Sequence, residues 1–325
     1  MFRLAKLLIL LSLALVQSYS GPSRGPLLSA GSGMSATWVD LYPGRPDERR
    51  IGSLTFLGGV ALHSDDGAFG GFSSLSVRGD RFVLLSDGGN IVRFRMDARF
   101  AIGDVAFDNL PAGPGRGWSK RSRDSESMTL DPAGRAWIGF ENFNEIWRYA
   151  PGLRLPAVGA APPAMAKWDS NGGPESLVRL RDGRMLTIAE TQQLPGSEAR
   201  VALMFASDPV AMPRRGVRFG YLPPAGFDPS DATQLPDGRI MVLNRRLAPP
   251  LAWSAALTLI DPAGIRPGAI VRGREIARLA PPLTVDNFEG LAATREGGAT
   301  ILWIVSDDNL FPLERTLLLK FRLEP

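Results

Sequence analysis

A repeated segment constrains the fold of this chain more than any other feature of its sequence. Each copy has a small residue before a short apolar strand, a turn with Gly or Asp, and a second strand that ends in a polar residue. The small residues recur at intervals of about 50 to 60 residues, at Ser74, Ser127, Ser176, Asp231 and Gly290. Several short strands per unit at such a period are typical of β-propeller blades. The sequence therefore predicts an all-β propeller with five blades.

The two ends of the chain indicate how this ring closes. Strand-like runs at residues 37–41 and 51–62 precede the first full copy, whereas the last copy has only residues 316–323 after its second strand. Closing the ring removes exposed strand edges. We therefore expect the N-terminal strand at 51–62 to complete the last blade. A six-bladed ring would need an extra unit within residues 151–168, a Pro- and Ala-rich segment that we interpret as a loop.

Turn residues support the assignment of strands. Residues 131–134, 181–183 and 236–238 each combine Asp with Gly between two apolar runs, and these residues supply the conformations that connect antiparallel strands. No window sustains an apolar stripe with a period of 3.6 residues, so long helices are not expected.

The N-terminal residues are interpreted as a signal for export. Arg3 and Lys6 precede a ten-residue apolar run, and small residues that suit cleavage follow it. The run is too short for a membrane span, although an uncleaved anchor is the alternative interpretation. Residues 21–36 are rich in Gly, Ser and Pro and are predicted to form a flexible leader. We expect a periplasmic or secreted monomer with one domain at 37–325 and no transmembrane segment after cleavage.

Composition excludes several kinds of chemistry. The chain has no Cys, so disulfides and thiolate catalysis are excluded. Its single His63 excludes zinc sites with the HExxH motif and makes a Ser-His-Asp triad a weak alternative. The net charge of +4 is spread along the chain, which argues against nucleic acid as a partner.

Acidic residues occupy corresponding positions at the start of three repeats. Glu126, Glu175 and Glu289 share one register, and Ser73 and Ser230 hold that position in the other two copies. In a propeller these positions meet near the axis, where like charges raise one another's pKa unless a cation compensates. We predict these three glutamates as the catalytic residues.

A second set of polar residues follows the next strand of each repeat. The set comprises Asp87, Glu141, Glu190, Asn244 and the pair Asp307 and Asp308. Oxygen ligands in this number suit Ca²⁺ or another divalent cation, and the acidic members are predicted as metal ligands. Arg245 and Arg246 follow directly after Asn244 and, with Asn287, are predicted to bind a phosphate or carboxylate of the substrate.

These polar positions have a second, structural interpretation. Buried polar groups need hydrogen-bond partners whether or not they have a function. The same residues could therefore be latches that bond the backbone of neighbouring blades, and the sequence leaves both interpretations open.

Several segments resemble a known family. They include residues 58–62, 71–75, 126–128, 174–176 and, above all, 286–291 (DNFEGL) with 302–309 (LWIVSDDN). Together they resemble the bacterial phytase-like domain, described as esterase-like activity of phytase, over most of the chain. The resemblance implies an exported propeller that hydrolyses a phosphoester or a carboxylic ester. In the better understood β-propeller phytases, which this chain resembles in architecture only, calcium ions held by carboxylates bind the substrate phosphate and activate water.

Two functions are consistent with these patterns. The first is an exported hydrolase that acts on a small phosphorylated or ester substrate with the help of a metal ion. The second is a non-catalytic periplasmic propeller that binds a ligand, an envelope polymer or another protein.

Overall fold

The computed structural model describes residues 27–115, 119–250 and 252–324. The predicted export signal therefore lies outside the described residues, as does the first part of the predicted leader. The last part of that leader is attached to the fold. Leu28 is buried, and Ser29 and Ser32 donate hydrogen bonds to the Asp66 carboxylate at 2.7 and 2.9 Å.

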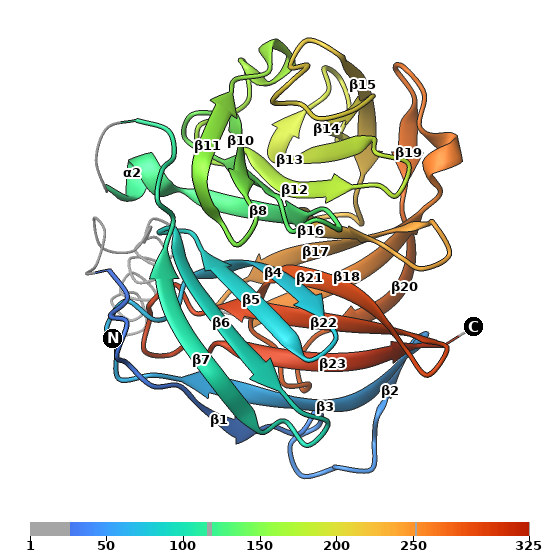
Figure 1. Ribbon diagram of the computed structural model, residues 1–325. Helices are drawn as coiled ribbons and strands as arrows, with labels where there is room; N and C mark the ends of the chain where they lie inside the picture. The colour runs from blue at the N-terminus through green and yellow to red at the C-terminus, as the bar shows by residue number, and fades with distance from the viewer. Residues whose placement is uncertain (1–26, 116–118, 251, 325) are drawn as a thin grey trace, which may run out of the picture.

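Five small sheets make up the fold (Figure 1). The first blade contains β4 (Phe72–Arg78), β5 (Arg81–Ser86), β6 (Asn90–Met96) and β7 (Ile102–Asn109). The second contains β8 (Ser125–Leu130), β9 (Ala136–Phe140), β10 (Glu145–Ala150) and β11 (Arg154–Ala160). The third contains β12 (Pro174–Arg179), β13 (Met185–Gln193), β14 (Arg200–Phe205), β15 (Gly216–Leu222) and a short parallel strand, β19 (Ile270–Arg272). The fourth contains β16 (Asp228–Gln234), β17 (Ile240–Ala248), β18 (Ala252–Ile260) and β20 (Arg274–Leu279).

The fifth blade combines the two ends of the described chain. Its C-terminal strands are β21 (Asn287–Glu296), β22 (Ala299–Asp307) and β23 (Leu317–Leu323), and β3 (Leu54–His63) pairs antiparallel with β23. β1 (Ser35–Trp38) lies outside β3, and the two-residue β2 (Arg50–Ile51) also pairs with β3. Buried Phe56 of β3 packs on Phe321 of β23, with ring centroids 5.5 Å apart. The predicted closure by an N-terminal strand is confirmed.

The innermost strands contact one another in ring order, from β4 through β8, β12 and β16 to β21, and β21 contacts β4. The propeller with five blades is therefore confirmed. Apolar side chains fill the space between adjacent blades. In one cluster, Leu186 and Ile188 of the third blade pack with Val242 of the fourth. The cores thus hold each blade against the next and leave polar residues free to occupy the axis.

The predicted turns are confirmed. Gly134, Gly183 and Gly238 have φ angles of 85°, 91° and 97°, in the region that favours glycine. Each closes the connection between the first and second strands of its blade. Helices in the described ranges are short: α2 (Lys120–Arg123), η1 (Pro163–Met165) and η2 (Pro262–Gly264). Among the described residues no helix is both long and apolar enough to cross a membrane.

The interpretation of residues 151–168 as a loop is wrong in part. β11 occupies 154–160 and pairs antiparallel with β10 as the outer strand of the second blade. Pro156 obscured the strand in the sequence, but an edge strand tolerates proline because one of its sides makes no ladder hydrogen bonds. The segment completes a blade and adds none to the ring.

Candidate functional site

A β-bulge at the same place in every innermost strand creates the first set of polar positions. The pairing register shifts between residues 72 and 74, 125 and 127, 174 and 176, 229 and 231, and 288 and 290. The bulged residues are Ser73, Glu126, Glu175, Ser230 and Glu289. A bulge turns its side chain away from the regular alternation of the strand. The predicted common register of the three glutamates therefore has a structural cause.

Two of the bulged residues act as latches. The Ser73 hydroxyl donates a hydrogen bond to the carbonyl of Ser125 in the next blade at 2.6 Å. The Ser230 hydroxyl donates to the carbonyl of Phe288 at 3.1 Å. Asp231 accepts from the backbone N–H of Leu291 in the next blade at 2.7 Å. At these positions the structural interpretation is confirmed.

The glutamates at the bulges lie in a different environment. All three are buried, and burial is the largest influence on each. Burial and the Glu175 carboxylate raise the pKa of Glu126 well above its usual range. Burial and the Glu190 carboxylate do the same to the pKa of Glu175. Burial also raises the pKa of Glu289, although Arg245 opposes the rise. The structure thus brings the predicted acids into one electrostatic group.

The second set of positions lies opposite the start of each innermost strand. The N–H of Asp87 donates to the carbonyl of Gly71 at 2.8 Å, and that of Glu141 donates to Asp124 at 2.9 Å. Arg245 pairs with Asp228, and Asp307 pairs with Asn287. The ring of second positions is Asp87, Glu141, Glu190, Arg245 and Asp307.

Asn244 does not belong to this ring. In the sequence the apolar run of the fourth blade ends at Asn244, but β17 continues to Ala248. The sequence prediction therefore named the residue one position before the ring position. Asn244 is fully buried between blades, where the Tyr221 hydroxyl donates to its Oδ1 at 2.7 Å and its own Nδ2 donates to the Ala256 carbonyl at 3.0 Å. It is a latch, and Arg245 takes the ring position.

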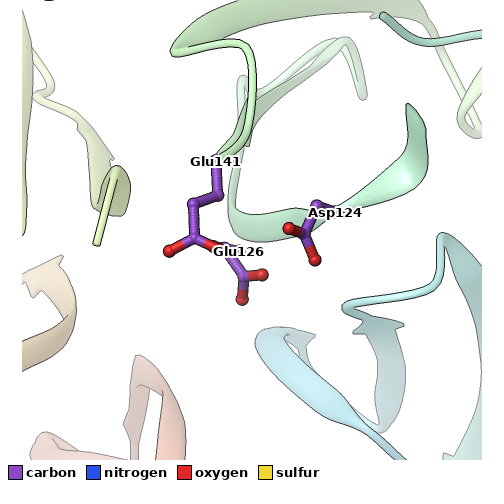
Figure 2. A group of neighbouring side chains, drawn as sticks. All are labelled: Asp124, Glu126 and Glu141. Atoms are coloured by element: carbon purple, nitrogen blue, oxygen red, sulfur yellow. The ribbon is translucent and has the colours of Figure 1, made fainter. Parts of the chain in front are cut away.

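Two groups of three carboxylates lie close enough to hold an ion. In the first group, one oxygen each from Asp124, Glu126 and Glu141 lie within 4.8 Å of one another, and Figure 2 shows these side chains converging. In the second, the same holds for Glu141, Glu175 and Glu190. Glu141 belongs to both groups, and burial, Asp124 and Glu190 raise its pKa to about 8.

Sequence reasoning missed Asp124. It directly follows α2 and stands two residues before Glu126, opposite Glu141. The acidic pair Asp-x-Glu at the start of a blade was the available signal. The other blades carry Gly, Asp or Asn at this position. The repeat alone therefore does not predict a functional acid there.

Arg245 lies between the second group and the fifth blade. Its Nη2 is 2.6 Å from Glu190 and its Nη1 is 2.6 Å from Glu289. Nη1 also donates to Oδ1 of Asn287 at 2.9 Å, and Nδ2 of Asn287 donates to Glu289 at 2.8 Å. Burial alone would lower the pKa of Arg245, but the surrounding glutamates raise it well above its usual range. Arg245 and Asn287 therefore form one hydrogen-bonded cluster with Glu190 and Glu289.

The remaining predicted residues divide between the site and its surroundings. Asp307 is buried near Glu289, and burial and that carboxylate raise its pKa. Asp308 instead fixes the loop after β22, because it accepts hydrogen bonds from the N–H of Gly71 at 2.9 Å and from the Thr316 hydroxyl at 2.8 Å. Arg246 is exposed, with its guanidinium carbon 6.0 Å from the Phe227 ring centroid. The structure thus places Arg246 outside the acid group, whereas Asp308 lies at its edge and contributes to the raised pKa of Asp307.

We define the acidic centre as the carboxylates at the bulged positions and the ring positions, together with Asp124. They are Asp87, Asp124, Glu126, Glu141, Glu175, Glu190, Glu289 and Asp307.

A family model described as phytase-like, esterase-like activity of phytase, matches residues 67–310. The chain belongs to this phytase-like family. The match begins just before β4 and ends just after Asp307, so it covers every residue of the acidic centre. No curated protein matches the phytase-like chain.

Several solved structures are similar to this phytase-like chain. One is a PQQ-bound aldose sugar dehydrogenase from Streptomyces coelicolor, with 12% identity and a TM-score of 0.46, covering 90% of this chain and 99% of that one. Another is virginiamycin B lyase from Staphylococcus aureus, with 12% identity and a TM-score of 0.42, covering 90% and 100%. A third is the Malassezia sympodialis allergen Mala s 1, with 13% identity and a TM-score of 0.43, covering 82% and 87%.

The donor set of this phytase-like propeller fits a hard divalent cation. All candidate ligands are carboxylate oxygens, which Ca²⁺ and Mg²⁺ prefer. Burial and mutual repulsion raise the pKa of several members. A bound cation would favour their ionised form and reduce the repulsion between them. The acidic clusters could therefore bind a metal.

Proposed function

We propose that this phytase-like propeller is a hydrolase that cleaves a phosphoester or a carboxylic ester of a small molecule with the help of a divalent cation such as Ca²⁺. The observation that carries the proposal is the pair of carboxylate groups that share Glu141, beside the guanidinium of Arg245. Such a site combines ligands for a cation with a donor for an anionic substrate. Family membership supports the same reaction class.

The first carboxylate group is the cation site of this proposal. Asp124, Glu126 and Glu141 would hold the ion there. In the second group Glu190 is already paired with Arg245 at 2.6 Å, which reduces the attraction of that group for a cation. A cation bound by such carboxylates polarises an ester and lowers the pKa of a water molecule bound beside it.

Arg245 is suited to bind the anionic part of the substrate. A guanidinium has five N–H donors. Four hydrogen bonds join Arg245 to described residues: Nε and Nη2 donate to Glu190, and Nη1 donates to Asn287 and Glu289. One N–H of Nη2 therefore remains to stabilise negative charge that develops on the substrate oxygen.

Glu175 is suited to carry a proton. It is buried, and burial and the Glu190 carboxylate raise its pKa well above its usual range, which favours the protonated carboxyl. A carboxylic acid in that state can donate its proton to a leaving oxygen. Glu289, in contrast, is held by Arg245 and Asn287, so its role is to fix the guanidinium in place.

The experiment measures turnover and metal content together. Protein freed of metal is assayed on nitrophenyl phosphate, nitrophenyl acetate and phytate, with and without Ca²⁺, and the bound metal is measured by elemental analysis. We expect turnover of at least one substrate that depends on the cation, and Glu141→Gln should weaken Ca²⁺ binding at least tenfold. Glu198→Gln, an exposed loop residue, is the control and should behave like the wild type.

The outcome decides between the two candidate functions. Absence of turnover on all three substrates, with no metal bound, would contradict the proposal. Binding of Ca²⁺ without turnover would favour the non-catalytic binding module. In that case the wild type has no turnover, and Glu289→Gln should change its Ca²⁺ affinity or its thermal stability.

A further inference from the structure

The opposite mouth of the propeller contains a cavity of about 210 Å³. The acidic centre lies at the start of the innermost strands, whereas the cavity is lined by their later residues. All five of these strands contribute, through residues 75–78, 128–130, 177–179, 232–234 and 291–293. Because innermost strands of a propeller run in one direction along the axis, the cavity and the acidic centre lie at opposite ends.

The charge of this lining is the reverse of that at the acidic centre. Among the described residues that line the cavity, three are arginines, Arg78, Arg179 and Arg181, and none is Asp or Glu. Hydroxyl and amide groups add further hydrogen-bonding capacity. They come from Ser76, Thr129, Thr233 and Gln234.

Two of the arginines are fixed by neighbouring blades. Arg78 donates to the carbonyls of Asp131 and, at 3.4 Å, Pro132 in the turn of the second blade. Arg181 donates to the carbonyls of Leu235 at 2.8 Å and Pro236 at 2.7 Å in the turn of the fourth blade. Carbonyls are neutral partners, so both positive charges remain uncompensated by these bonds.

Arg179 has no such partner. Its guanidinium makes no hydrogen bond or ion pair with any residue that the structure describes, although the residue is half-buried. Arg179 interacts electrostatically with two carboxylates, Asp131 and Asp182. Each already forms an ion pair with another arginine: Asp131 with Arg135 at 2.7 Å, and Asp182 with Arg184 at 2.8 Å. A partly desolvated guanidinium that makes no direct ion pair is stabilised by a bound anion. An anion in the cavity would supply the missing charge.

We propose that this cavity binds a small oxyanion, either free phosphate or sulfate, or the phosphate or carboxylate group of a small molecule. A volume of about 210 Å³ corresponds to roughly seven water molecules at about 30 Å³ each, which is enough for one oxyanion and some ordered water. Arginine provides the planar, charged donor that oxyanions bind best. This site is distinct from the ester site, and it does not depend on the proposed hydrolysis.

The first experiment is calorimetric titration of the full chain, freed of metal, with inorganic phosphate and with sulfate. We expect binding without Ca²⁺, because no carboxylate is among the described residues that line the cavity. Arg179→Gln should weaken it at least tenfold, and Arg179→Lys, which keeps the charge, should lose less. Arg218→Gln changes an exposed arginine of β15 and should bind like the wild type.

Titrations with citrate and with glucose 6-phosphate identify the source of the anion. Affinity tenfold tighter than for inorganic phosphate would assign the site to a small molecule that carries the group, and equal affinity would assign it to the free ion. The proposal fails if neither phosphate, sulfate nor the two organic anions bind, if binding requires Ca²⁺, or if Arg179→Gln binds as tightly as Arg218→Gln. Because the titrations use protein without metal, their result is independent of whether the ester site is active.

Discussion

At the scale of single residues, Arg245 occupies the ring position that carboxylates occupy in the other four blades. It bonds Glu190 in the third blade and Glu289 in the fifth. A cation at this position allows two buried acids to ionise next to each other. The side chain therefore has a stabilising role besides the role we propose in binding substrate.

We predict that Arg245→Gln destabilises the protein by about 3 to 5 kcal/mol at pH 8, because it leaves carboxylates buried without a counter-charge. The loss should be smaller at pH 5, where those carboxylates are more protonated. Urea unfolding followed by circular dichroism at both pH values measures it. Arg246→Gln, the exposed neighbour, should change stability by less than about 0.5 kcal/mol. Equal effects of the two substitutions would show that the ion pairs of Arg245 contribute nothing.

Part of this site could be predicted from the sequence. The common register of Glu126, Glu175 and Glu289 was visible because each precedes a small residue and an apolar strand. The ring position of Arg245 could not be predicted, because the apolar run of β17 continues into Arg and Leu and does not show where the strand ends. Distances between blades depend on the bulges and on ring closure, so neither the two carboxylate groups nor the unpaired Arg179 could be foreseen.

At the scale of elements, the repeat predicted the inner strands better than the outer ones. Inner strands lie between two neighbouring blades, so their apolar pattern is strong. Outer strands such as β11 are exposed and carry proline, and they follow no such pattern. Closure was predictable because the last repeat lacked a strand that the start of the chain could supply.

The pairing of β3 with β23 allows a test by circular permutation. Leu323 and Leu54 are directly paired, so a two-residue Asn-Gly turn should join them as a hairpin. We predict that a permuted chain from residue 67 to 323, then the turn, then 54 to 63, folds with the β-sheet content of the full chain apart from β1 and β2. Circular dichroism and the unfolding rate in urea measure the outcome, with the full chain as reference. A permuted chain that remains unfolded would argue that β1 and β2 are required for closure.

At the scale of the whole molecule, the two mouths of the propeller carry opposite charge. Carboxylates gather at the starts of the innermost strands, and arginines gather at their ends. This separation makes stability depend on pH and on ions. In the acidic centre, the electrostatic repulsion between carboxylates increases as they lose protons.

We predict that the metal-free protein is less stable at pH 8 than at pH 5. The folded state raises the pKa of Glu141 from 4.5 to about 8, so it favours the protonated acid. The contribution of Glu141 to the free energy of unfolding is therefore fully present below about pH 4.5. It is lost as the pH rises toward 8, by on the order of 5 kcal/mol. The melting temperature Tm of dialysed protein measures the change.

Two additions sharpen this measurement. Ca²⁺ should raise Tm more at pH 8 than at pH 5, because the ion binds the ionised carboxylates. Glu141→Gln should reduce the dependence of Tm on pH. A metal-free protein whose Tm is equal at both pH values, or higher at pH 8, would contradict the mutual repulsion that we infer for the acidic centre.

The joining of β3 to β23 also has a consequence for synthesis. During translation β3 is synthesised long before its partner β23. The edge of β3 that pairs with β23 therefore has no strand partner until β23 has left the ribosome. A product cut short before β23 would expose that edge to chaperones and proteases.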